Sequence, residues 1–310
     1  MQLKASGRLE FKRDQPSPLA TLADWLRYAE RRFRRARLAY GHGTDNAFDE
    51  AAWLLFHVAK RPSHDLAGAL PPALTSPQRR RVLALIEKRI ATRKPLAYLL
   101  REAWLGEHRF YVDERVIVPR SHIAELLRDG LGPWIRSPGQ VRRALDMCTG
   151  SGCLAVLLAL AFPRASVDAV DVSASALAVA RRNVDDYRMG GRLRLVRSDL
   201  FAGLGDVRYD VVVANPPYVD AQAMGRLPQE FRREPGLALA GGRDGLAFVR
   251  RILSDARRHL SPRGVLVVEI GNNRKAVERA YPMLPLTWLE TSAGGDNVFL
   301  LTRAELPATP

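Results

Sequence analysis

A strand-like run that ends in two prolines carries the residues best suited to chemistry. Residues 209–214 are apolar and valine-rich, and Asn215, Pro216, Pro217 and Tyr218 follow them directly. Prolines end a strand and stiffen the exit, so Asn215 and Tyr218 would be held at its carboxyl end, where open α/β sheets bind ligands. The Asn215 amide oxygen and the Pro216 carbonyl can accept hydrogen bonds from one NH2 group, and the Tyr218 ring can stack on a flat partner. The tetrapeptide is therefore either a clamp for a planar amide or amino group, or a proline-rich turn.

A glycine-rich turn upstream favours the clamp. A predicted strand at 141–146 is followed by this turn and then by an apolar helix. Glycines let the main chain approach a ligand, and the helix N-terminus faces it. The third glycine of a dinucleotide fingerprint is missing, so the turn alone predicts only a nucleoside cofactor. The expected cofactor contacts here are Asp146, Cys148, Thr149, Gly150, Ser151 and Gly152.

Two more acids follow the next two predicted strands. Asp171 lies 19 residues after Gly152, where a carboxylate can accept both ribose hydroxyls. Its alternative role, a helix N-cap, falls better on Ser173. Asp199, followed by Leu200, is either a partner for an adenine amino group or a plain loop residue. Asp171, Asp199, Leu200 and Asn215 complete the expected cofactor site.

The N-terminal third of the sequence is helical in pattern. Residues 1–18 are polar and expected to fray, and apolar spacing predicts helices over 19–40, 46–60 and 76–92. Gly41 and Gly43 would stop the first helix, and the Ser76 hydroxyl would cap the third. Residues 104–118 then alternate like a β-hairpin that turns at Asp113 and Glu114, before a short helix after Ser121.

Strands and helices alternate in the remainder, which predicts a doubly wound parallel sheet. The predicted strands are 141–146, 166–171, 192–197, 209–214, 264–270, 286–291 and 297–302. The predicted helices are 153–162, 173–187, 244–260 and 273–281. No helix separates the last two strands, so they should pair as an antiparallel hairpin at the end of the sheet.

Charge is a weaker indicator. The net charge is +15, from 48 Lys and Arg against 33 Asp and Glu. Such a balance indicates a polyanion such as nucleic acid or a ribonucleoprotein, or only an arginine-rich proteome. The first helix carries Arg27, Arg31, Arg34 and Arg35 on its polar side, which is either a solvated face or a ribosome-facing patch.

Composition also bears on the compartment and on metals. Hydrophobic residues make up 47% of 310 residues, enough for a real core. No apolar run has the length of a membrane span, and Met1 to Gly7 lack a signal peptide's apolar region, so the cytoplasm is expected. Cys148 and Cys153 have no Cys or His partners at metal-ligand spacing, so small core residues are expected and no metal site.

The glycine turn, Asp171, Asp199 and the tetrapeptide at 215–218 each follow one of four predicted strands. Together they resemble the site of class I S-adenosylmethionine-dependent methyltransferases that act on amide or amino nitrogen. More closely, the chain resembles the bacterial protein-(glutamine-N5) methyltransferases, in the branch that modifies the third large-subunit ribosomal protein. The resemblance covers about residues 19–303. The runs that carry it are Val-Pro-Arg-Ser at 118–121 with Ile-Ala-Glu-Leu at 123–126, Asp-Met-Cys-Thr-Gly-Ser-Gly-Cys at 146–153, Asn-Pro-Pro-Tyr-Val-Asp at 215–220, Leu227-Pro228 through Glu234-Pro235, and Gly-Gly-Arg-Asp-Gly-Leu at 241–246. His122 departs from the family pattern, which has Pro at this position.

The resemblance implies a fold, a domain organisation and an activity. It implies a helical substrate-recognition domain at 1–98, a β-hairpin linker at 99–120 and a Rossmann-like methyltransferase domain at 121–310. Asn215, Pro216, Pro217 and Tyr218 would orient a glutamine amide toward the methyl group of S-adenosylmethionine. The partner would be a large-subunit ribosomal protein, free or within an assembling subunit with rRNA nearby.

Other functions remain open from the sequence. The same chemistry on peptide chain release factors is one alternative. Methylation of an adenine or guanine amino group is another, because the clamp suits those groups equally well, although no large target-recognition region is evident beyond the helical bundle. A non-enzymatic basic RNA-binding module with a vestigial pocket is the third, and the intact set of acids and glycines disfavours it.

Overall fold

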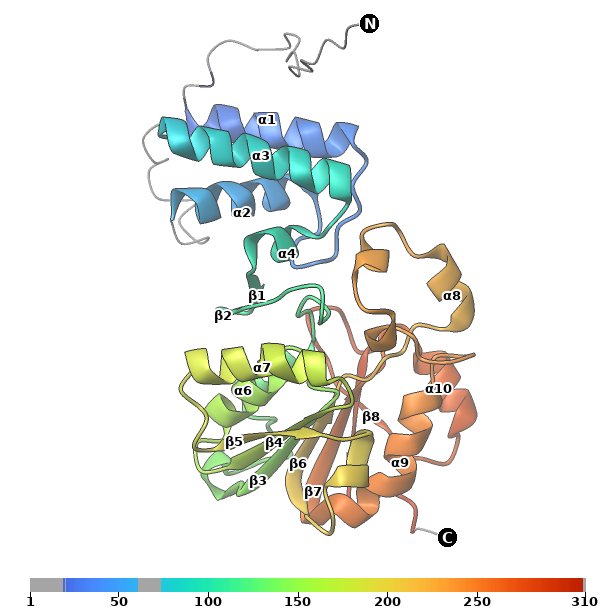
Figure 1. Ribbon diagram of the computed structural model, residues 1–310. Helices are drawn as coiled ribbons and strands as arrows, with labels where there is room; N and C mark the ends of the chain where they lie inside the picture. Colours follow the sequence, from blue (N-terminus) through green and yellow to red (C-terminus); the bar gives the residue numbers. More distant parts are fainter. Residues whose placement is uncertain (1–18, 20, 61–73, 309–310) are drawn as a thin grey trace, which may run out of the picture. The chain divides into compact units, whose positions relative to one another are not determined.

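The computed structural model describes residue 19, residues 21–60 and residues 74–308. These described residues fall into two compact units (Figure 1): those within Met1–Arg37 and Asn46–Lys88, and those within Leu38–Asp45 and Arg89–Pro310. The functional division at residues 98 and 120 stays a prediction, and the expected fraying of residues 1–18 lies outside the described residues. Within the described ranges, no helix combines the length and apolar character needed to cross a bilayer.

The first unit contains helices α1 (Leu22–Arg35) and α2 (Ala47–Ala59) and most of α3 (Ser76–Thr92). α1 begins with a capping box, in which the Thr21 side chain accepts from Asp24 N and the Asp24 side chain accepts from Thr21 N. Leu22, Trp25, Ala29 and Phe33 are its buried residues, at the spacing expected for one face of a helix. Asn46 caps α2 through Asp49 N.

Two helix ends differ from the prediction. α1 ends at Arg35 instead of continuing to 40, and Arg37 takes a positive φ of 49°, so the break comes before Gly41 and Gly43. Thr75, and not Ser76, caps α3. Its hydroxyl accepts from Gln78 N at 3.4 Å while the Gln78 side chain accepts from Thr75 N at 2.9 Å.

The linker hairpin is shorter than predicted and turns earlier. After the short helix α4 (Leu96–Leu100), β1 (Ala103–Leu105) pairs antiparallel with β2 (His108–Phe110). The chain reverses at Gly106 and Glu107, where glycine tolerates the positive φ of 59°. A turn does form at Asp113 and Glu114, where Val116 N donates to Asp113 O at 3.2 Å and the Asp113 carboxylate accepts from Arg115 N at 3.1 Å. The predicted hairpin around it is wrong, because the turn lies beyond β2 and the paired strands are β1 and β2.

The second unit is built on a mixed sheet of seven strands in the order β5-β4-β3-β6-β7-β9-β8. The strands are β3 (Arg143–Met147), β4 (Ser166–Asp171), β5 (Leu193–Arg197), β6 (Tyr209–Ala214), β7 (Leu260–Glu269), β8 (Thr287–Trp288) and β9 (Val298–Thr302). β3 to β7 pair in parallel, while β9 pairs antiparallel with both β7 and β8. The doubly wound sheet and its terminal antiparallel hairpin are thus confirmed, although β8 has only two of the six residues predicted at 286–291 and β7 begins four residues before the predicted 264.

Helices cover both faces of this sheet (Figure 1). They are α5 (Ile123–Arg128), α6 (Cys153–Ala161), α7 (Ala174–Asp186), α9 (Ala247–His259) and α10 (Arg274–Ala280). The short helix α8 (Ala221–Arg226) buries no residue and lies away from the sheet. Successive strand residues alternate between two cores: Val211 and Val213 pack with α5 and α6, whereas Val212 packs with α9 and α10. Both faces of the central strands are buried, which explains their continuous apolar runs.

Candidate functional site

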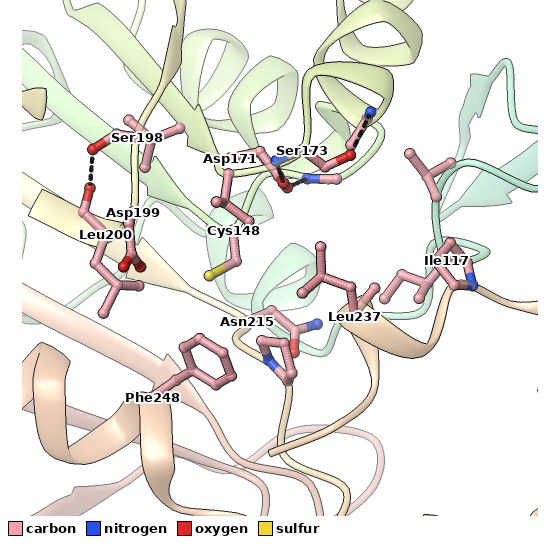
Figure 2. A pocket seen from close by; sticks show the side chains of 18 of the residues that line it. Ile117, Cys148, Asp171, Ser173, Ser198, Asp199, Leu200, Asn215, Leu237 and Phe248 are labelled. Atoms are coloured by element: carbon pink, nitrogen blue, oxygen red, sulfur yellow. Dashed lines mark hydrogen bonds between the residues drawn. The ribbon is translucent and has the colours of Figure 1, made fainter. Parts of the chain in front are cut away.

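A pocket lies at the carboxyl ends of four adjacent strands (Figure 2). Cys148 and Gly150 follow β3, Asp171 ends β4, Asp199 follows β5 and Asn215 follows β6. Of the predicted site residues, Cys148, Gly150, Asp171, Asp199, Leu200, Asn215 and Pro217 line the pocket. Asp146, Thr149, Ser151, Gly152, Pro216 and Tyr218 lie outside its described lining. Residues that follow β3, β4, β5 and β6 therefore line one pocket, as predicted.

Three residues of the glycine turn have positive φ angles, and two of them line the pocket. Cys148, Gly150 and Gly152 have φ values of 59°, 54° and 79°. A Cβ on Gly150 would meet nothing within 4 Å, so the main chain is open to a ligand there. A Cβ on Gly152 would lie 3.0 Å from the Cβ of Ala180, so this glycine instead allows α6 to begin close against α7.

Asp171 is fixed by main-chain donors on both sides. Its Oδ2 accepts from Gly150 N and its Oδ1 from Ser173 N, each at 2.9 Å. Burial raises the pKa of this carboxyl above its usual range, against the lowering effect of those hydrogen bonds. The hydroxyl of Ser173 caps α7 by accepting from Ala176 N at 3.2 Å, which confirms that Ser173 takes the N-cap.

Asp146 is a buried brace. It is 1% exposed, and its Oδ2 accepts from the Thr149 hydroxyl at 2.5 Å. Its Oδ1 has no hydrogen-bond partner among the described residues. Burial raises the pKa of Asp146 to about 7, although the bond from Thr149 works in the opposite direction. Asp146, a predicted cofactor contact, is thus buried in the turn and holds Thr149, the residue before Gly150, instead of lining the pocket.

The far end of the pocket combines charge with apolar surface. Asp199 Oδ2 accepts from Arg251 Nη2 at 2.8 Å, which leaves Asp199 Oδ1 available to a ligand. Leu200 and Phe248, the latter from α9, line the same region (Figure 2). A carboxylate oxygen can accept a hydrogen bond from the amino group of a nucleobase, and an aromatic ring beside it can stack on the face of the base.

Asn215 and Tyr218 have different surroundings. Asn215 is partly buried and lines the pocket, and its side-chain amide has no hydrogen-bond partner among the described residues. The Tyr218 carbonyl accepts from Asn273 Nδ2 at 2.8 Å, and its ring lies so close to Gly271 that a Cβ there would be 2.6 Å from Tyr218 Cε2. The ring braces the loop in this structure, and its stacking on a substrate stays a prediction.

Several lining residues were not predicted from the sequence. They are Arg115, Val116, Ile117, Val170, Val172, Ser173, Ala176, Ser198, Pro235, Leu237, Ala238 and Phe248. The β-formers at 116–118 were interpreted as a strand, although the segment is irregular and reaches the pocket. The only available signal for Leu237 was the neighbouring Glu234-Pro235 pair.

Comparisons with known proteins identify the family. The family model described as "Methyltransferase small domain" matches residues 134–243, and the one described as "PrmC N-terminal domain" matches residues 24–100. The catalytic domain of hMettl16 in complex with MAT2A 3'UTR hairpin 6 has a TM-score of 0.51 at 17% identity, over 80% of this chain and 91% of that chain. At this identity the likeness shows the fold alone.

The curated relatives are much closer. A protein of Burkholderia pseudomallei named ribosomal protein uL3 glutamine methyltransferase is 55% identical over 94% of this chain and 98% of its own length. The proteins of the same name from Bordetella pertussis and Neisseria gonorrhoeae are 56% and 54% identical, each over 93% of this chain and over 97% and 96% of their own lengths. With similarity of this extent, the chain belongs to the ribosomal protein uL3 glutamine methyltransferase family.

Proposed function

We propose that this methyltransferase transfers a methyl group from S-adenosylmethionine to the side-chain amide nitrogen of a glutamine in ribosomal protein uL3. The name shared by its relatives supports this substrate. The observation that carries the proposal is Asn215, whose unpartnered amide lines a pocket formed by the ends of four strands. Its action in the cytoplasm is part of the same proposal, since ribosomal proteins assemble there.

The residues of the pocket fit S-adenosylmethionine. The Asp171 carboxylate, fixed at the end of β4, would accept the ribose hydroxyls, and the open main chain at Gly150 would lie against the cofactor. Asp199 Oδ1 would accept from the adenine amino group, and Leu200 and Phe248 would cover its faces. When bound, the cofactor supplies a sulfonium methyl group that is already activated for transfer.

The protein would act mainly by orienting the substrate. An amide nitrogen is a poor nucleophile because its lone pair is delocalised into the carbonyl. Acceptance of both amide hydrogens by Asn215 Oδ1 and the Pro216 carbonyl would aim the nitrogen at the methyl group. Orientation of this kind can lower a barrier by up to roughly 7–11 kcal/mol when the geometry is ideal.

Tyr218 does not serve as the base. Burial, with a further contribution from the negative charge of Glu269, raises the pKa of Tyr218 to about 12. Its hydroxyl therefore keeps its proton at neutral pH, and the proton released from the methylated amide would leave to solvent.

The substrate is tested by methylation assays with the purified protein. Free uL3, uL3 within large-subunit assembly intermediates, release factors and naked RNA are each incubated with the cofactor, and methyl transfer is measured by intact mass. The expected result is one added methyl group on uL3, which should form more slowly by about 10²-fold or more with Asn215→Ala. Faster transfer to assembly intermediates would support rRNA contact, for which the net charge of +15 is the supporting feature. Methylation of release factors or RNA, but not of uL3, would contradict the proposal.

A further inference from the structure

An exposed leucine stands at the substrate side of the pocket. Leu237 is 59% exposed although it lines the pocket. Figure 2 shows it on the side where Asn215 and Ile117 lie, with Asp199 and Leu200 on the other side. Exposure of one leucine is not informative alone, but Leu237 also lines the pocket, and apolar side chains predominate among the residues that contact ligands in such pockets. Resting on the proposed function, we propose that Leu237 is an apolar subsite for the aliphatic stem of the substrate glutamine.

The segment that carries Leu237 is fixed at its first end by a buried carboxylate. Glu234 is 4% exposed, and its Oε1 accepts from Val118 N at 2.9 Å. Arg120 donates to both carboxylate oxygens, at 2.6 Å each. Paired donors of this geometry make a strong and directional contact. Residues 118–120 and the segment that begins at Glu234 are therefore held together.

The other end of the segment is fixed to the loop that carries Asn215. After the short 3-10 helix η5 (Gly236–Ala238), Leu239 O accepts from Val219 N at 2.9 Å. Gly241 N then donates to Val219 O at 2.7 Å. Val219 directly follows Tyr218, so Leu237 has a fixed position relative to the Asn215 loop. Its exposure comes from a segment held at both ends, which sets the side chain in place before a substrate arrives.

The chemistry of glutamine suits this position. Two methylene groups separate its main chain from the amide that Asn215 would orient, and they must pass through the mouth of the pocket. Contact with Leu237 would remove both apolar groups from water. Asparagine has one methylene fewer, so its amide could reach Asn215 only if its main chain moved inward past Leu237. A single methylene changes specificity by roughly 10–200-fold in apolar pockets, so Leu237 favours glutamine over asparagine.

The test compares Leu237→Ala with Leu237→Met and with Met283→Ala, a control at a side chain that is 90% exposed and does not line the pocket. Steady-state kinetics with uL3 and cofactor affinity by calorimetry are measured for each. Leu237→Ala is expected to raise KM for uL3 about tenfold, with a smaller change in kcat and unchanged cofactor affinity. Leu237→Met should have a KM for uL3 close to that of the wild type, because methionine is also large and apolar, and Met283→Ala should behave as wild type.

A second measurement uses uL3 whose modified glutamine, located by mass, is replaced by asparagine. The ratio of kcat/KM for glutamine-bearing uL3 to kcat/KM for asparagine-bearing uL3 should be smaller for Leu237→Ala than for the wild-type enzyme. An unchanged KM and preference, or a loss of cofactor affinity alone, would overturn the subsite and leave the proposed function standing. If wild-type enzyme does not methylate uL3 at all, the proposed function and the subsite fail together.

Discussion

The two ends of the pocket differ in how much their polar groups are already engaged. At the cofactor end, both oxygens of Asp171 accept main-chain hydrogen bonds and Asp199 is paired with Arg251. At the substrate end, the Asn215 amide has no partner in the described chain and Leu237 is exposed. A site for a small invariant ligand can be organised in advance, whereas a site for a protein side chain must leave groups open until that side chain arrives. Variants at each end should therefore fail in different measurements.

The largest expected effect is on stability, at the brace beneath the cofactor end. The pKa of Asp146 is about 7 in the folded protein, against an ordinary value of 3.8, because burial disfavours its charge. The folded state thus binds more protons than the unfolded state between about pH 4 and pH 7, so this group lowers stability as pH rises through that window. Asp146→Asn has no such titration. Its free energy of unfolding relative to that of wild type should therefore increase by up to about 4 kcal/mol as the pH rises from 4 to 8.

Urea unfolding at pH 4, 6 and 8 measures this gain. Asp24→Asn is a useful control, because hydrogen bonds from Thr21 lower the pKa of Asp24 to about 2. Asp24→Asn should lower the free energy of unfolding at pH 6 and 8, and this effect should diminish as the pH decreases below 4. Parallel pH profiles for wild type and Asp146→Asn would show that Asp146 is not forced to bury its charge.

Asn215→Ala should break the substrate end. Loss of the acceptor leaves the glutamine amide misoriented, so turnover should fall about 10²-fold or more, while cofactor affinity changes much less. Single-turnover rates with uL3 and calorimetry with the cofactor separate the two effects. Tyr218→Phe keeps the ring against Gly271 and should be milder than Tyr218→Ala. Turnover by Asn215→Ala at the wild-type rate would reduce the tetrapeptide to a structural turn.

Asp171→Ala should break the cofactor end. It removes the carboxylate expected to bind the ribose, so cofactor affinity should weaken by about 1–3 kcal/mol, the scale of charge-assisted hydrogen bonds. Protonation removes the same acceptor, and the raised pKa of Asp171 means that wild-type affinity should begin to fall at a higher pH than for an exposed aspartate. Calorimetry across pH 4–8 measures both effects, and unchanged affinity in the variant would reject the assignment.

The parts of this site that follow regular structure could be predicted from the sequence. The valine-rich run of β6 and the shorter apolar run of β4 indicated two strands and where they end, and parallel pairing through β3 places Asp171 and Asn215 at one edge of the sheet. The inner arrangement of the glycine turn was not readable. Whether Asp146 or Cys148 lines the pocket depends on main-chain φ angles that residue types do not determine.

The irregular segments failed for a different reason. Val116, Ile117 and Val118 have strand-like composition, but Val118 N donates to the distant Glu234 carboxylate instead of a neighbouring strand. The hairpin reverses at Gly106, whereas the turn at Asp113 joins no paired strands. The segment at 116–118 is held by a contact between residues 116 positions apart, and one sequence does not reveal such a pairing.

The smallest expected effect sharpens the comparison at the adenine side. Arg251 and Asp199 are about half exposed, so their ion pair is weakly stabilising, and Arg251→Ala should weaken cofactor binding by less than about 1 kcal/mol. If Arg251 acts by orienting Asp199, the effects of Arg251→Ala and Asp199→Asn on affinity should be non-additive, because either change disrupts the same carboxylate. Calorimetric titration of both single variants and the double variant measures this coupling. Strictly additive effects would show that Arg251 does not act through Asp199, and that the cofactor end is less organised in advance than its hydrogen bonds indicate.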